Sequence, residues 1–133
     1  MSDNVTPFVL RLATGIVFLS HGLIKLFVFT VPGTVAFFEQ VGFPGWLAVP
    51  TMAVEIAGGT LMLAGLFTRF VGLAFLPILA GALMTHWPNG YMFSVANGGW
   101  EFPALMLVLV ALQIRLGDGA FALNNVNLKR SFA

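Results

Sequence analysis

The sequence predicts an all-α protein, a bundle of four transmembrane helices with a short interfacial helix between the first and the second. Hydrophobic residues make up 59% of the 133 positions and charged residues only 8%, and the mean hydropathy is +0.96. A soluble chain of this size needs many more charged residues to cover its surface. The apolar residues also form four runs long enough to cross a bilayer, which takes about 20 residues. We therefore expect one membrane domain over residues 1–133.

The first transmembrane helix is expected at residues 6–29. The segment before it, MSDNVTP, has no basic region, and the apolar run is too long for a signal-peptide core, so we expect this helix to be retained. Pro7 suits its first turn, where a missing N–H is harmless. Pro32 and Gly33 are predicted to end it.

The connection over residues 30–47 is predicted to contain a short helix, Thr34–Val41, with Thr34 as its N-cap. Its phenylalanines can share one side and leave Glu39 and Gln40 toward water. This pattern is typical of a helix that lies in the membrane interface.

Three further transmembrane helices are expected at residues 48–67, 70–87 and 101–117. Gly58 and Gly59 in the second allow close helix packing. The very short turn Phe67–Phe70 predicts a tight antiparallel hairpin. Pro77 lies in the middle of the third helix and predicts a kink.

The orientation follows from the lysines and arginines. Four spans place both termini on one side, together with Arg69, Arg115, Lys129 and Arg130, whereas the loops on the other side contain no Lys or Arg. Positive charge favours the cytoplasmic side. We therefore expect both termini in the cytoplasm of a bacterial inner (plasma) membrane protein.

Five ionisable residues are predicted to lie in the outer half of the bilayer, and they come from all four helices: His21, Lys25, Glu55, His86 and Glu101. Such groups are costly in lipid and usually face the bundle interior or water. Their convergence predicts a polar pocket that is open to the outer face. It could bind a quinone head group, an anion or a small polar substrate, and it could pass protons.

Each residue has a predicted role and a simpler alternative. Lys25 and His21 would hydrogen-bond the ligand, with Glu55 orienting or neutralising them; alternatively, Glu55 forms a structural ion pair with one of them. His86 and Glu101 would gate proton access; alternatively, they only complement helix dipoles.

Arg69 is expected to be a structural or secondary polar residue, and so is Arg11, which should lie deeper in the bundle. Its expected neighbours are Gln113 and the end of the fourth helix, although it could instead snorkel to the cytoplasmic head groups.

Composition and spacing exclude several other kinds of chemistry. The absence of cysteine excludes a thiol nucleophile, a disulfide and an iron–sulfur cluster held by this chain. A net charge of +1 excludes a broad nucleic-acid interface. Two histidines and two carboxylates could bind zinc or iron, but Lys25 stands where the second ligand of a helical His pair would be. We expect no metal site.

The sequence resembles the DoxX family of small four-helix membrane proteins over about residues 5–123. Six short patterns support the resemblance: Arg11–Gly15, His21–Lys25, Gly42–Pro44, Glu55–Gly59, Gly65–Arg69 and Gly117–Gly119. The residues carried over by position are Arg11, His21, Lys25, Glu55 and Arg69. The family is often labelled oxidoreductase, and its relatives include the membrane subunit of a thiosulfate:quinone oxidoreductase and membrane partners of oxidative-stress enzymes.

The resemblance and the polar layer together suggest a quinone- or small-substrate-binding membrane subunit of a redox system, working with a partner redox protein. One alternative is a non-catalytic membrane scaffold that assembles partner proteins. Another is a lipid or small-solute carrier, for which Pro77 would supply a hinge. The small-residue faces could also pack between copies in a homo-oligomer.

Overall fold

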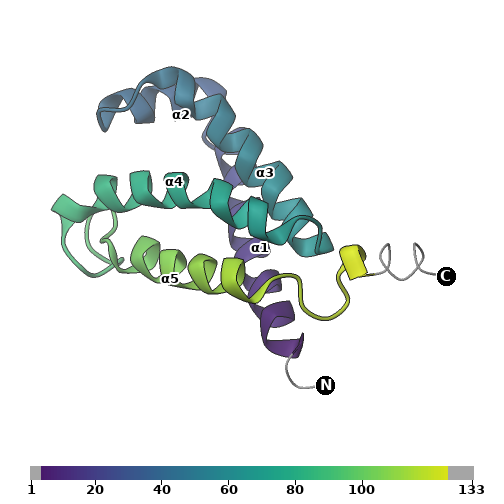
Figure 1. Ribbon diagram of the computed structural model, residues 1–133. Coiled ribbons are helices and arrows are strands. Elements are labelled where there is room, and N and C mark those ends of the chain that lie inside the picture. The colour runs from purple at the N-terminus through teal and green to yellow at the C-terminus, as the bar shows by residue number, and fades with distance from the viewer. Residues whose placement is uncertain (1–3, 126–133) are drawn as a thin grey trace.

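The computed structural model describes residues 4–125, and this part of the chain is all-helical, without a strand (Figure 1). The all-α prediction is therefore confirmed. The elements in chain order are α1 (Val5–Phe27), α2 (Thr30–Gln40), the 3₁₀ turn η2 (Gly45–Leu47), α3 (Ala48–Ala64), α4 (Thr68–His86), the 3₁₀ turn η3 (Trp87–Asn89) and α5 (Glu101–Leu116).

Three helical segments are long and apolar enough to cross a membrane: Val5–Phe27, Gly45–Ala64 and Thr68–Asn89. These segments identify a membrane protein. The fourth predicted span corresponds to α5, which has 16 residues. At 1.5 Å per residue it is about 24 Å long, which is less than the roughly 30 Å of a hydrocarbon core. Its crossing of the membrane stays a prediction.

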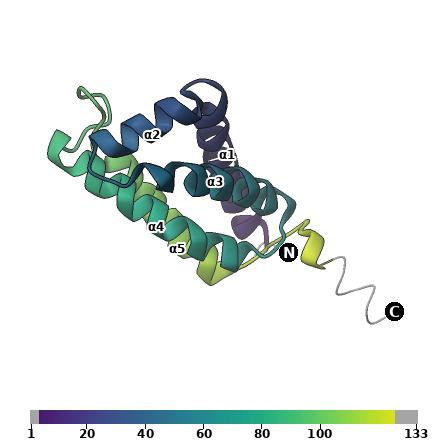
Figure 2. The same cartoon turned by 90° about the horizontal axis from the view of Figure 1, so that it is seen from above.

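The helices pack in two pairs. α1 lies mainly against α3, and α4 lies mainly against α5. Figure 1 shows the two pairs close together where the chain termini lie and further apart toward α2 and η3, and Figure 2 shows α4 and α5 side by side from above. We call these the terminal end and the loop end. α3 and α4, which are expected to form a tight hairpin, contact each other less extensively than the two helices of either pair do.

A close approach of backbones joins α1 to α3. A Cβ atom added at Gly59 would lie 2.6 Å from the backbone nitrogen of Leu19 and 2.9 Å from its Cα. Only glycine fits there, because the obstructing atoms belong to the backbone of the other helix. This contact agrees with the packing role expected for Gly59.

The core lies where the two pairs meet. Phe18 of α1 and Phe75 of α4 stack with ring centroids 3.6 Å apart and planes 1° apart. Both side chains are buried, together with Met62, Val71, Leu79, Met106 and Val110. The core therefore takes residues from α1, α3, α4 and α5.

The predicted boundaries around α2 are wrong. α1 ends at Phe27 and α2 begins at Thr30, so Pro32 and Gly33 lie in the first turn of α2 instead of ending the helix before it. Proline is tolerated there because first-turn N–H groups have no intrahelical partner.

Thr34 is likewise not an N-cap. Its buried hydroxyl donates to the carbonyls of Thr30, at 2.8 Å, and Lys25, at 3.2 Å. This side chain therefore ties α2 to the end of α1.

α4 continues without interruption through Pro77, and the kink expected there stays a prediction.

We expect Gly59→Ala to lower the stability of the protein, whereas Gly81→Ala should not. Alanine favours a helix interior by up to about 1 kcal/mol over glycine, but at Gly59 its methyl group meets the backbone of Leu19. The net cost there should be about 1–2 kcal/mol. At Gly81 the nearest atom to an added Cβ is Cζ of Phe43 at 3.6 Å, an ordinary contact. Thermal unfolding of both variants in detergent measures the difference. Equal midpoints would contradict the close packing of α1 on α3.

Candidate functional site

An ion pair joins α1 to α3 near the loop end. Nζ of Lys25 donates to both carboxylate oxygens of Glu55, at 2.8 and 2.9 Å. The Glu55 side chain is 4% exposed and that of Lys25 is 20% exposed. Gly22, one turn before Lys25, makes room for this contact, because a Cβ there would lie 3.0 Å from Cβ of Glu55. The partner of Glu55 is therefore Lys25 and not His21.

The geometry of this pair leaves one donor available. An ammonium group has three N–H donors, and Glu55 accepts two of those of Lys25. The third has no acceptor among the residues that the structure describes. Since Lys25 is also partly exposed, it can donate to a carbonyl or an oxyanion that approaches from outside the bundle.

His21 lies one helical turn before Lys25 and is exposed. Its Nδ1 is 2.8 Å from the carbonyl oxygen of Val17. A carbonyl can only accept, so the neutral ring carries its proton on Nδ1 and leaves Nε2 as an acceptor. The ring lies nearly parallel to that of Phe102 in α5, with centroids 6.1 Å apart. The His21 ring, with Nε2 as its proton acceptor, therefore lies near the start of α5.

His86 and Glu101 hold the loop between α4 and α5. Nδ1 of His86 lies 3.1 Å from the carbonyl oxygen of Asn97 and 3.2 Å from that of Gly98. Oε1 of Glu101 accepts from the backbone N–H of Phe93 at 3.0 Å. These bonds order the loop, and they support a structural role for both residues. Their proposed control of proton access stays a prediction.

The structure thus joins two of the five predicted site residues directly. Within residues 4–125, Lys25 and Glu55 bond to each other, whereas His21, His86 and Glu101 bond to backbone groups. In the same part of the chain, no three His, Asp or Glu side chains are placed to hold a metal ion together.

Arg11 is buried, with 1% of its surface exposed, so the snorkelling alternative is wrong. Its Nη1 donates to the carbonyls of Met62, at 3.4 Å, and Leu63, at 2.9 Å, in the last turn of α3. A cation at a helix C-terminus satisfies free carbonyls and complements the dipole.

The second terminal nitrogen of Arg11, Nη2, contacts the segment that follows α5. Nη2 donates to the carbonyl of Ala120, just after α5, at 2.8 Å. The predicted neighbour Gln113 is not a bonding partner of Arg11, because its Nε2 donates to the carbonyl of Gly117 at 2.6 Å.

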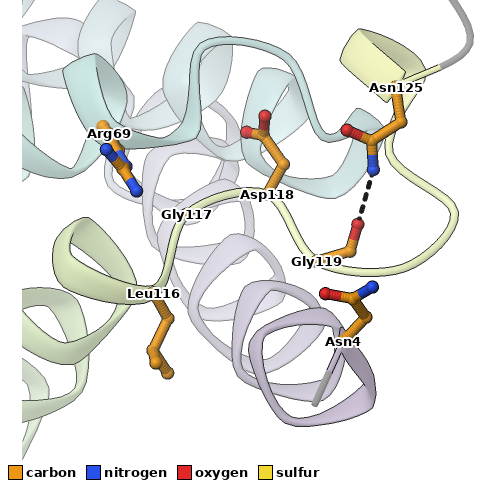
Figure 3. Close-up of a pocket in the computed structure, with 7 residues that line it drawn as sticks. All are labelled: Asn4, Arg69, Leu116, Gly117, Asp118, Gly119 and Asn125. Carbon is orange, nitrogen blue, oxygen red and sulfur yellow. Dashed lines mark hydrogen bonds between the residues drawn. The ribbon is translucent and has the colours of Figure 1, made fainter. Parts of the chain in front are cut away.

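The terminal end contains a polar pocket that the sequence interpretation missed. It has a volume of about 700 Å³ and is lined by Asn4, Arg69, residues 116–119 and Asn125 (Figure 3). The hydroxyl of Thr68 donates to the carboxylate of Asp118, which is one of the lining residues. The patterns Gly65–Arg69 and Gly117–Gly119 therefore meet in space. Each of these two patterns follows a helix, α3 or α5, and both helices end on the same side of the bundle. This feature of the sequence could have predicted that the two patterns meet.

We expect the loss of Lys25 to lower the free energy of unfolding more than the loss of Glu55 does, and the loss of both residues to change it little. Lys25→Met should cost about 3 kcal/mol, because it leaves the buried carboxylate of Glu55 without a partner. Glu55→Leu should cost less, since Lys25 is 20% exposed and can reach water. The double variant should lie within about 1 kcal/mol of the wild type, because no charge is left unpaired. Unfolding in detergent measures all four proteins. Additive losses in the double variant would show that the two charges do not depend on each other.

The comparisons with known proteins identify the family of the chain. The DoxX family model matches residues 6–87. A Bacillus subtilis (strain 168) protein named "Putative oxidoreductase CatD" is 40% identical over 84 residues, which cover 63% of this chain and 61% of that protein. The "Uncharacterized protein YdgD" of the same organism is 30% identical over 114 residues, which cover 82% of this chain and 94% of that protein.

The alignment thus spans about three fifths of CatD. No solved structure matches the chain significantly. The family match covers more than half of the chain and includes the helices that carry Arg11, His21, Lys25 and Glu55. On these grounds the chain belongs to the DoxX family of membrane proteins.

Proposed function

We propose that this protein binds the polar head group of a quinone, or another small polar substrate, beside the Lys25–Glu55 pair, as a membrane subunit of a redox system. The observation that carries the proposal is a lysine that is paired within apolar helices yet partly exposed, with one N–H donor that has no acceptor in residues 4–125. A charge kept at this depth marks a functional site by default. Its position favours a ligand that reaches it from the lipid or from the loop end.

The chemistry of the pair suits a quinone carbonyl. Lys25 can donate its third N–H to that oxygen, and a charged donor makes a stronger hydrogen bond than a neutral one. Glu55 keeps the ammonium in place and balances its charge. The exposed ring of Phe102 beside His21 offers an apolar surface for the quinone ring.

His21 can take part in proton transfer. Its Nε2 can accept a proton from a quinol hydroxyl, which is the role of a general base. Reduction or oxidation of a quinone also requires two electrons. This chain has no cysteine, so the electrons would come from, or pass to, a partner redox protein that carries the electron-transfer group. The name of CatD supports a redox role but identifies no substrate.

We further propose that the protein lies in a bacterial inner membrane with both termini in the cytoplasm and α5 as a fourth span. Arg69 and Arg115 lie at the terminal end, whereas residues 28–47 and 87–100 at the loop end contain no Lys or Arg. This asymmetry supports a cytoplasmic terminal end. The Lys25–Glu55 pair would then lie in the outer half of the bilayer.

A second candidate function is a scaffold that assembles partner proteins, and the loop end favours it. Trp46, Trp87, Tyr91 and Phe93 are 58–71% exposed there. The loop between α4 and α5, which carries Tyr91 and Phe93, is ordered by its hydrogen bonds to His86 and Glu101. Replacing residues 90–97 by a Gly/Ser linker should abolish capture of a partner if this surface recruits it. Undiminished capture would count against the scaffold.

We expect a short-tailed benzoquinone to bind the purified wild-type protein and to bind Lys25→Met and the Lys25→Met/Glu55→Leu double variant about tenfold more weakly. The reason is the loss of one charge-assisted hydrogen bond, which contributes about 1.5–3 kcal/mol. Titration in detergent, followed by the quenching of tryptophan fluorescence, measures the dissociation constants.

The control is Glu39→Gln, which removes an exposed carboxylate on α2 away from the pair. It should bind as the wild type does. The double variant separates binding from stability, because it is expected to fold without unpaired charge. No binding by the wild type, or equal binding by all variants, would refute a quinone site at this pair.

A further inference from the structure

The pocket at the terminal end lies apart from the Lys25–Glu55 pair and has no part in the function proposed above. Its walls come from three separate parts of the chain: Asn4 before α1, Arg69 in the first turn of α4, and residues 116–119 after α5 with Asn125 beyond them. Figure 3 shows Arg69 and Asn4 on opposite sides of residues 117–119, with Leu116 at one edge. The pocket therefore exists only in the folded bundle.

Buried side chains hold the floor of the pocket in one position. The carbonyl of Gly117 accepts from Nε2 of Gln113 at 2.6 Å, and the carbonyl of Ala120 accepts from Nη2 of Arg11 at 2.8 Å. The backbone N–H of Ala120 donates to the carbonyl of Asn4 at 2.8 Å. Gln113 and Arg11 are almost completely buried. A binding surface fixed in this way loses little conformational entropy when a ligand arrives.

Arg69 supplies the positive charge of the pocket. Its guanidinium lies across Gly117, where an added Cβ would be 3.2 Å from both Nε and Nη2. Its bond within the described chain is a long one, 3.5 Å from Nη2 to the carbonyl of Arg115. A guanidinium has five N–H donors in a planar fork that fits phosphate oxygens. Arg69 is exposed, so most of these donors are available to a ligand.

Asp118 is the acidic residue of the lining, but its carboxylate is already engaged. One oxygen accepts from the hydroxyl of Thr68, and the other accepts from Nδ2 of Asn124 at 3.1 Å. The buried guanidinium of Arg11 also interacts with it electrostatically. Figure 3 shows the carboxylate directed away from Leu116. Its repulsion of an anion beside Arg69 is therefore reduced.

The surroundings of Arg69 match the level at which a bilayer changes from head groups to acyl chains. α3 ends at Ala64 and α4 begins at Thr68, so the apolar helices stop here. Phe70, next to Arg69, is 73% exposed, and Leu116 is 45% exposed. A cation beside outward-facing apolar side chains can hold a phosphate while the attached chains follow the helix surface.

We propose that the pocket around Arg69 binds a phosphate group, presented by the head group of an anionic phospholipid. The guanidinium of Arg69 donates to the phosphate oxygens, and the side-chain amide of Asn4, which makes no capping bond to α1, provides a further donor. Phe70 and Leu116 contact the acyl chains. The pocket would hold one such lipid at the terminal end of each chain.

Native mass spectrometry of the full-length protein, stripped of lipid in detergent, tests this site with three probes: phosphatidylglycerol, phosphatidylcholine and inorganic phosphate. We expect one phosphatidylglycerol per chain, bound more tightly than phosphatidylcholine. Arg69→Gln should weaken it about tenfold or more, through loss of charge-assisted hydrogen bonds. Arg115→Gln is the matched control: it removes an exposed arginine at the same end that does not line the pocket, and its effect should stay below about twofold.

Asn4→Asp provides a test that does not depend on the folding of Arg69→Gln. An aspartate at this position caps α1 well, yet it places a negative charge in the pocket, so it should weaken phosphatidylglycerol binding while the protein stays folded. Displacement of the lipid by inorganic phosphate would support the shared phosphate chemistry. If inorganic phosphate binds only when Arg69 is present but phosphatidylglycerol does not bind, the proposal that a lipid supplies the phosphate would be overturned. Equal losses in Arg69→Gln and Arg115→Gln would overturn the site, because they would indicate only general attraction between opposite charges.

Discussion

The need to satisfy every charge inside an apolar bundle shapes this structure. The chain has few charged residues, and three of them lie within α1 and α3: Arg11, Lys25 and Glu55. Lys25 and Glu55 satisfy each other. The Nη1 and Nη2 groups of Arg11 donate to backbone carbonyls at the end of α3 and after α5. Since an unpaired charge in lipid is costly, these contacts fix how α1 sits against the rest of the bundle.

Close backbone packing makes these charge contacts possible. Gly22 lets α1 approach α3 at the level of Lys25 and Glu55, and Gly59 does the same deeper in the bundle. Arg11 continues the contact at the far end by capping α3. α1 and α3 thus form a unit in which glycines allow close packing along the middle of the interface and charged residues make contacts toward its two ends. α4 and α5 join this unit through the core around Phe18 and Phe75.

The two ends of the bundle then differ in chemistry. The loop end has the partly exposed ammonium of Lys25, the free ring nitrogen of His21 and a loop rich in aromatic residues, so it suits a flat, polar-headed ligand or a partner protein. The terminal end has Arg69 above a rigid backbone segment, so it suits a phosphate oxyanion. The two proposed sites therefore lie at opposite ends of the α1–α3 interface.

The sequence by itself determined the all-α class, the membrane environment, the family and the approximate bounds of the long helices, because apolar run length and composition are local properties. It also singled out Glu55 and named Lys25 among its partners, since opposite charges at similar depth in neighbouring helices are expected to pair. It placed the start of α2 wrongly, because Pro32 and Gly33 are tolerated in a first helical turn as well as after a last one.

Only the tertiary structure decided which helices pair, that Arg11 is buried as a cap, that His86 and Glu101 bond to a loop, and that Gly65–Arg69 meets Gly117–Gly119 in a pocket. These features depend on the angles between helices. Such angles are set by the summed packing of many side chains, which no single stretch of sequence specifies.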